Sequence, residues 1–182
     1  MVAQAVAEAL NCTTPLSSPE HTVDGCGQCP TCRRIARGAH PDVLVVTPGD
    51  SGTIKVEQAR DVIERAGYRP FEGRRRVVVI DEADAMVPAA QNALLKTLEE
   101  PPSASSFILV SSMPDALLST VRSRCPRLRF GALAPDDVAG VLVRDHGYAE
   151  MDARAAAADA DGSVGRALAA ATADLQEARA IA

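Results

Sequence analysis

The sequence has few aromatic residues, with no Trp, two Tyr and three Phe. A core without large rings must be built from aliphatic side chains, and hydrophobic residues make up 47% of the chain. A length of 182 residues allows one domain of ordinary size and a small companion. Val-rich segments alternate with Ala-rich segments, and the carboxyl-terminal third is Ala-rich. This arrangement predicts an α/β domain followed by an α-helical domain.

A net positive charge is also lacking, since 24 acidic residues outnumber 19 Lys and Arg residues and the formal net charge is −5. A protein that coats nucleic acid is usually basic, so any DNA contact is expected to be local or to belong to an assembly. No apolar run has the length of a membrane span, and the first residues show no basic stretch followed by an apolar signal core. We therefore expect a cytoplasmic protein without a membrane partner.

Four of the five cysteines have the spacing of a metal site, with Cys12 upstream of the run Cys26-Gly27-Gln28-Cys29-Pro30-Thr31-Cys32. Four thiolates can close a tetrahedral Zn²⁺ site in a reducing compartment. A closed site leaves no position for water, which indicates a structural role. Redox thiols are an alternative, although thioredoxin-type motifs contain two cysteines, and free thiols in a surface loop are another.

The most informative segment is the run 74–84, where three arginines precede Val77-Val78-Val79-Ile80 and two carboxylates, Asp81 and Glu82, follow. Four consecutive β-branched residues predict a fully buried strand. Ligands bind at the carboxyl ends of strands in open α/β sheets, so this Asp and Glu are candidates to hold Mg²⁺ and to polarise a water. A polar helix cap is the alternative. For the arginines, a solvated edge is favoured over a phosphate contact.

Apolar periodicity places the remaining elements. Buried strands are predicted over 42–47 and 107–110, an alternating strand over 126–130, and helices over 2–10, 33–37, 56–66, 88–99, 116–122, 136–146, 151–159 and 164–171. A Gly and a Pro bound a hinge at 131–135, so the predicted domains are 1–131 and 132–182.

Five motifs follow one another along the chain: the four cysteines, the run 77–84, Asn92-Ala93-Leu94-Leu95-Lys96-Thr97-Leu98-Glu99-Glu100-Pro101-Pro102, Ser123-Arg124-Cys125, and Gly162-Ser163-Val164-Gly165-Arg166-Ala167-Leu168. In this order they resemble the clamp-loader subunits of bacterial DNA polymerase III, the delta-prime and gamma/tau proteins. The resemblance covers essentially the whole chain, and the run from Asn92 to Pro102 is its most specific part. That family belongs to the AAA+ ATPases.

The resemblance implies a fold and partners. It implies an AAA+ parallel sheet with a zinc module at 12–40, followed by a small helical lid. The partners would be the gamma/tau and delta subunits and, through the assembly, the sliding clamp and primed DNA. The chain would then serve DNA replication as part of the polymerase III holoenzyme, a nucleotidyltransferase.

The resemblance also implies site roles. Asp81 and Glu82 fall on the Walker B positions, and Ser112, or Ser111, falls on the sensor 1 position. Arg124 falls on the arginine finger, which stabilises charge on the γ-phosphate in a neighbouring subunit's ATP site.

The chain departs from this family by having no Gly-x-x-x-x-Gly-Lys-Ser/Thr loop for phosphate. The resemblance then implies that the sheet lacks its first strand and that the chain is truncated at both ends. ATP and Mg²⁺ are expected only at a partner's site, or if the missing amino-terminal part were restored. We expect no magnesium-dependent hydrolysis of radiolabelled ATP by this chain alone, and a melting temperature below about 60 °C.

A second departure separates the members of the family. Hydrolysing members carry Arg, their sensor 2 residue, at the fourth position of Gly-Ser-x-Arg, whereas here Gly165 holds that place and Arg166 follows as a displaced sensor 2. A shift of one residue rotates a helical side chain by about 100°. We therefore favour a delta-prime subunit, while the intact Asp81-Glu82 pair suits gamma/tau. A zinc-ribbon interaction or DNA-binding protein, which would need only the cysteines, is a more remote alternative.

Overall fold

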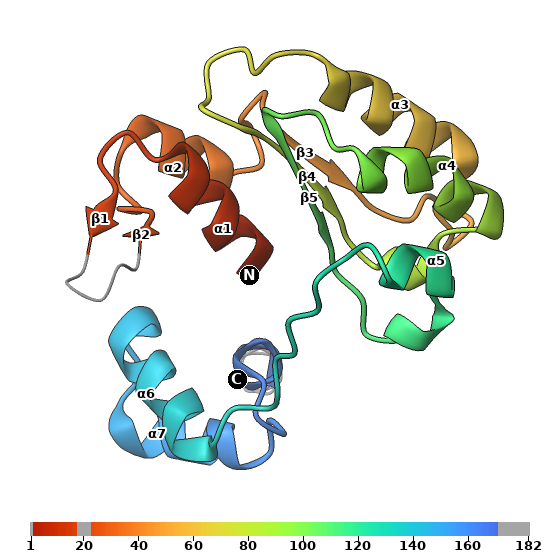
Figure 1. Cartoon of the computed structure of the whole chain (residues 1–182). Coiled ribbons are helices and arrows are strands. Elements are labelled where there is room, and N and C mark those ends of the chain that lie inside the picture. The colour runs from red at the N-terminus through yellow and green to blue at the C-terminus, as the bar shows by residue number, and fades with distance from the viewer. Residues whose placement is uncertain (1, 18–22, 171–182) are drawn as a thin grey trace. The chain divides into compact units, whose positions relative to one another are not determined.

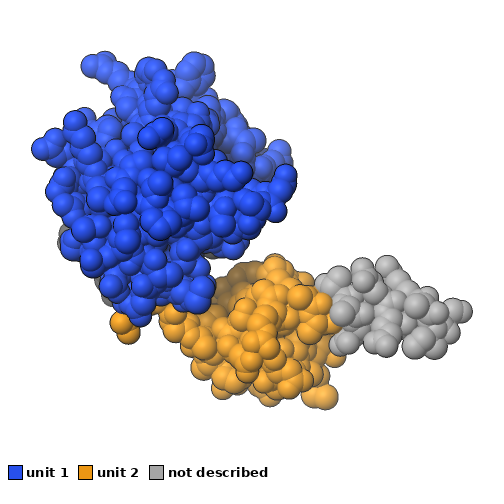
Figure 2. Space-filling view, turned by 90° about the vertical axis from the view of Figure 1, so that its right-hand side faces the viewer, with its two compact units in different colours: residues 1–127 blue, residues 128–182 orange. Residues whose placement is uncertain are grey.

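The structure is a computed structural model, and it describes residues 2–17 and 23–170. The chain divides into two compact units, residues 1–127 and 128–182 (Figure 2). The division falls after residue 127, whereas the sequence placed it after residue 131. In the described ranges, no helix combines the length and the apolar character needed to cross a membrane.

A three-stranded parallel sheet lies at the centre of the first unit (Figure 1). Its strands are β3 (Val43–Val46), β4 (Arg76–Ile80) and β5 (Ser105–Leu109), in the order β3-β4-β5. Every residue of the central strand β4 is buried, because the sheet is covered on both faces. The predicted α/β class and parallel sheet are confirmed.

Helices cover both faces of this sheet (Figure 1). The helices α3 (Val56–Gly67) and α4 (Pro88–Glu99) pack on one face. On the other face lie α1 (Val2–Asn11) and α2 (Pro30–Ala36). Successive side chains of a strand point to opposite faces, so Val78 and Ile80 join the first core while their odd-numbered neighbours join the second.

Short elements complete the first unit. They are the antiparallel pair β1 (Leu16–Ser17) and β2 (Val23–Asp24), the 3₁₀ turns η1 (Ala83–Ala85) and η2 (Pro114–Ala116), and the helix α5 (Ser119–Arg122). The helix predicted over 116–122 is therefore a turn followed by one short helix.

The regular elements in the described part of the second unit are all helices. It contains α6 (Pro135–His146), α7 (Glu150–Ala158) and a helical stretch at 164–170. Pro occupies the start of α6, and Gly147 ends it with φ of 69°, a conformation that glycine adopts without steric cost. Small and aliphatic side chains from all three segments form its core.

The strand predicted over 126–130 is wrong. These residues form no strand, and the side chains of Leu128 and Phe130 are 78% and 70% exposed. An alternating pattern assigns side chains to two faces, but a strand also needs a neighbouring backbone to satisfy its N–H and C=O groups. Among the described residues, the free edge of β5 pairs with no further strand.

The three arginines at 74–76 make hydrogen bonds within the fold, and of the three only Arg74 is exposed, as the solvated edge that we favoured requires. Arg74 donates hydrogen bonds to the last carbonyl groups of α1. Arg75 donates to carbonyl groups in the segment that leads into β5. Arg76 donates to a carbonyl group near the end of α3 and to the buried carboxylate of Asp42. The three guanidinium groups therefore hold the layers of the fold together.

Candidate functional site

The predicted acidic residues lie at the carboxyl edge of the sheet, directly after β4. The N–H of Asp81 donates to the carbonyl group of Val46, 2.9 Å away at the end of β3. The N–H of Ala83 donates to that of Val110, 2.7 Å away, just after β5. Both neighbouring strands thus fix the acidic segment, with Asp81 half-buried and Glu82 exposed. This is the edge at which α/β sheets bind ligands.

Glu82 has a left-handed backbone conformation, with φ 49° and ψ 50°. For a residue other than glycine this conformation costs about 1–2 kcal/mol. It persists because the following N–H groups are held by Val110 and by the carbonyl group of Glu82 itself. Such strain is concentrated at functional positions. No sequence pattern indicated this conformation, since Glu has no preference for this region.

The side chain of Ser111, rather than that of Ser112, contacts the acidic segment. Its hydroxyl group donates to the carboxylate of Asp84 at 2.6 Å, and the N–H of Met113 donates to the same hydroxyl at 3.1 Å. This hydrogen bond from Ser111 is the main reason that the pKa of Asp84 lies below its ordinary value. Ser112 is exposed. Of the two serines considered, Ser111 is therefore the one whose hydroxyl group contacts the acidic segment.

Replacing Ser111 with Ala is expected to raise the pKa of Asp84 toward its ordinary value, because the hydroxyl donor stabilises the charged carboxylate. An NMR titration of the Asp84 carboxyl carbon measures this pKa. Ser112→Ala is the matched control and is expected to leave it in place. Equal titration curves for wild type and Ser111→Ala would contradict the assignment.

Arg124 lies just after α5 and contacts its own subunit. One terminal nitrogen, Nη1, donates to the carbonyl group of Thr120 at 2.8 Å, and the other, Nη2, forms an ion pair with Glu99 at the end of α4. The side chain is 29% exposed. The structure thus does not bring Arg124 to Asp81 or Glu82 of the same chain, and its side chain remains partly exposed.

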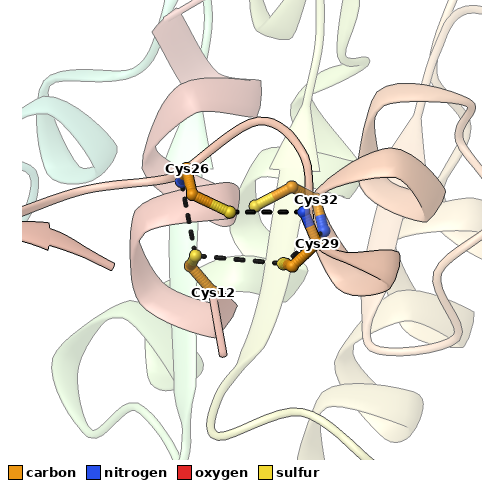
Figure 3. Close-up of side chains that lie close together, drawn as sticks. All are labelled: Cys12, Cys26, Cys29 and Cys32. Carbon is orange, nitrogen blue, oxygen red and sulfur yellow. Dashed lines mark hydrogen bonds between the residues drawn. The ribbon is translucent and has the colours of Figure 1, made fainter. Parts of the chain in front are cut away.

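The four predicted cysteines come together in the first unit (Figure 3). Cys12 follows α1, Cys29 caps the start of α2, and Cys32 lies within α2. All four sulfur atoms lie within 4.8 Å of one another, and those of Cys12 and Cys29 are 3.9 Å apart. A tetrahedral Zn²⁺ with bonds of 2.3 Å holds its sulfur atoms about 3.8 Å apart. The four sulfurs therefore fit such an ion.

Backbone N–H groups point at these sulfur atoms. Cys26 donates to the sulfur of Cys12 at 3.3 Å, Cys29 to that of Cys26 at 3.3 Å, and Cys32 to that of Cys29 at 3.4 Å. Hydrogen bonds, first of all from the side chain of Thr13, lower the pKa of Cys29 to about 5. Burial raises the pKa of Cys32 to about 12. A divalent cation would supply the positive charge that a buried thiolate lacks.

The amino-terminal 134 residues match a family model described as "DNA polymerase III, delta subunit". The chain belongs to this family. It is thus a clamp-loader member of the AAA+ proteins, as the order of motifs predicted.

Curated relatives of this clamp-loader chain carry two kinds of name. It is 44% identical to "DNA polymerase III subunit delta'" of Yersinia pestis over 101 residues, which are 55% of this chain and 30% of that protein. It is 36% identical to "DNA polymerase III subunit tau" of Escherichia coli K12 over 137 residues, which are 75% of this chain and 20% of that protein. The chain therefore spans a fifth to about a third of the length of such relatives.

Solved structures show the same fold. A gamma subunit-related protein of Thermotoga maritima aligns with a TM-score of 0.51 and 24% identity, over 66% of this chain and 46% of that one. The RuvB Holliday junction branch migration motor of Thermotoga maritima aligns with a TM-score of 0.53 and 16% identity, over 75% of this chain and 46% of that one.

Arg166 of the clamp-loader chain lies in the second unit. Its side chain forms an ion pair with Asp161 at 2.6 Å, and its N–H donates to the hydroxyl group of Ser163 at 3.3 Å. Both contacts stay within the unit. They cap the turn that precedes the helical stretch at 164–170.

Gln91 is a buried polar residue that the sequence patterns did not single out. Its amide nitrogen donates to the carbonyl group of Met86 at 3.1 Å, and its amide oxygen accepts from the N–H of Leu118 at 2.7 Å. The side chain is buried. It therefore ties the segment after the acidic residues to the start of α5, which leads to Arg124. Helical spacing from Leu94 was the available signal, because it places Gln91 on the buried face.

Replacing Gln91 with Leu is expected to lower the free energy of unfolding by about 1–3 kcal/mol, because it leaves buried N–H and C=O groups without partners. Urea unfolding followed by circular dichroism measures this loss. Asn92→Leu is the control, since Asn92 is the neighbouring exposed amide. Equal stabilities of the two variants would show that Gln91 does not make this connection.

Proposed function

We propose that this chain is the core of a delta-prime subunit of the DNA polymerase III clamp loader. It works in the cytoplasm beside gamma/tau and delta subunits and helps to load the sliding clamp onto primed DNA. ATP and Mg²⁺ are bound at a neighbouring subunit's site. This chain contributes Arg124 to that site as an arginine finger.

The position of Arg124 carries this proposal. The residue follows α5, and α5 packs against α4, so the backbone beneath the guanidinium group is fixed. The side chain stays at the surface and makes no ion pair with the acidic edge of its own sheet. Arg is permanently charged and presents a planar fork of donors that matches phosphate oxygens. A neighbour's triphosphate is therefore a suitable partner.

A gamma/tau subunit is the second candidate. The intact Asp81 and Glu82 at the end of β4 favour it, and so does the longer alignment with the tau subunit. Against it stand the higher identity to delta-prime and the displacement of Arg166 by one residue.

A zinc ion held by the four cysteines would have a structural role in either case. Cys12, Cys26, Cys29 and Cys32 would fill all of its positions and leave none for water. The ion would connect the end of α1 to the start of α2.

The test uses the full-length protein, reconstituted with gamma/tau and delta subunits. Arg124→Ala is expected to reduce ATP turnover and clamp loading on primed DNA by at least about tenfold, since an arginine finger contributes 10³–10⁵ to phosphoryl transfer at its own site. Gel filtration is expected to show normal assembly. Arg122→Ala, an exposed arginine two residues away, is the control. Full activity of the Arg124 variant would refute the proposed role.

A further inference from the structure

The guanidinium group of Arg124 is already engaged within its own subunit. Nη2 is paired with the carboxylate of Glu99, and Nη1 with the carbonyl group of Thr120. The remaining nitrogen, Nε, is buried and has no hydrogen-bond partner. Glu99 thus binds only one terminal nitrogen of Arg124, and the other N–H donors of the guanidinium group do not pair with a carboxylate.

A carboxylate and a phosphate group compete for the same donors of an arginine. A phosphate group with several oxygens can bind the fork through two parallel hydrogen bonds, which is stronger than a contact through one nitrogen. The pair with Glu99 is partly exposed, with 29% of the Arg124 and 53% of the Glu99 side chain accessible. Exposed ion pairs are weak, so an incoming phosphate group can displace this carboxylate.

We propose that Glu99 is a positioning residue, which holds Arg124 against its own subunit until the γ-phosphate of a neighbour's ATP replaces the carboxylate. This rests on the proposed function of Arg124. The pair competes with the finger's engagement and therefore weakens the apparent affinity of the neighbouring site for ATP. A nucleoside diphosphate lacks the γ-phosphate oxygens and leaves the pair intact.

The test measures kcat and KM for ATP in the reconstituted full-length assembly. Glu99→Gln removes the negative charge, and we expect it to lower KM by about two- to fivefold, the range that an exposed ion pair supports, with kcat within twofold. Glu100→Gln is the matched control, because it makes the same change one residue along the chain, at an exposed position. In the Arg124→Ala background, Glu99→Gln is expected to change neither parameter.

The outcomes separate the two proposals. If Arg124→Ala alone leaves ATP turnover unchanged, the proposed role of Arg124 as an arginine finger is wrong. If Arg124→Ala lowers kcat but Glu99→Gln leaves KM unchanged, the finger stands and the holding role of Glu99 is wrong. A lower KM that persists without Arg124 also overturns that role, because Glu99 would then act by another route. Melting curves of each variant verify that the fold is intact.

Discussion

Removal of the proposed zinc ion by a chelator is expected to destabilise the first unit more than any single substitution elsewhere. Structural zinc contributes about 10–16 kcal/mol of apparent binding free energy in zinc-finger peptides, and this becomes folding free energy when the site forms only in the folded chain. Without the ion, burial disfavours the thiolate of Cys32. The end of α1 and the start of α2 would then no longer be linked through a metal ion. We expect a large loss of helical circular dichroism after treatment with a strong chelator.

Metal analysis and substitution provide the controls for this prediction. Cys29→Ser is expected to reduce the bound zinc and to lower stability. Cys125→Ser is expected to do neither, because Cys125 is not among the four clustered sulfurs. Binding is also expected to weaken as pH falls, because protons compete with the metal for the thiolates. A purified wild-type chain that contains no zinc and is insensitive to chelators would refute the zinc site.

Asp42→Asn is expected to lower the free energy of unfolding by about 3–5 kcal/mol, because it breaks a buried ion pair. The Asp42 carboxylate is fully buried and accepts hydrogen bonds from the N–H groups of Phe71, Glu72 and Gly73 at 2.7, 2.9 and 2.8 Å. It also pairs with Arg76 at 2.8 Å. An Asn amide nitrogen would point its N–H groups at the N–H donors of residues 71–73 or of Arg76. The buried Arg76 would also lose its counter-charge.

Urea unfolding measures this loss, and Asp50→Asn provides the control because Asp50 is exposed in a loop. If both variants were as stable as wild type, the buried pair would not stabilise the fold. The segment that Asp42 holds contains Phe71, whose side chain is 82% exposed. The carboxylate therefore fixes a surface loop from inside the protein.

The same residue gives the stability a dependence on pH. Burial by itself raises the pKa of Asp42, but the N–H donors of residues 71–73 and Arg76 lower it to well below the ordinary value. A carboxyl group with a depressed pKa in the folded state stabilises the fold above its unfolded pKa of about 3.9 and loses this contribution as pH falls below it. The difference between wild type and Asp42→Asn is therefore expected to shrink below about pH 4.

Local patterns predicted most of the elements because they depend on neighbours in the chain. Four β-branched residues at 77–80 identified β4, and a Pro at the start with a Pro pair after the end identified α4 with its correct bounds. The spacing of four cysteines identified a cluster that the structure brings together. The prediction of a strand over 126–130 was wrong, because an alternating pattern of apolar residues does not provide a neighbouring strand to pair with.

The sequence by itself determined the α/β class, the acidic residues after a buried strand and the cysteine motif, because each depends on residues that lie close together in the chain. Tertiary structure alone decided the partners of the charged and polar groups. It paired Asp42 with Arg76, Arg124 with Glu99 and Ser111 with Asp84, and it set Glu82 in a left-handed conformation. A charged side chain does not specify its partner, because that partner is set by which distant segments the packed core brings within hydrogen-bond distance.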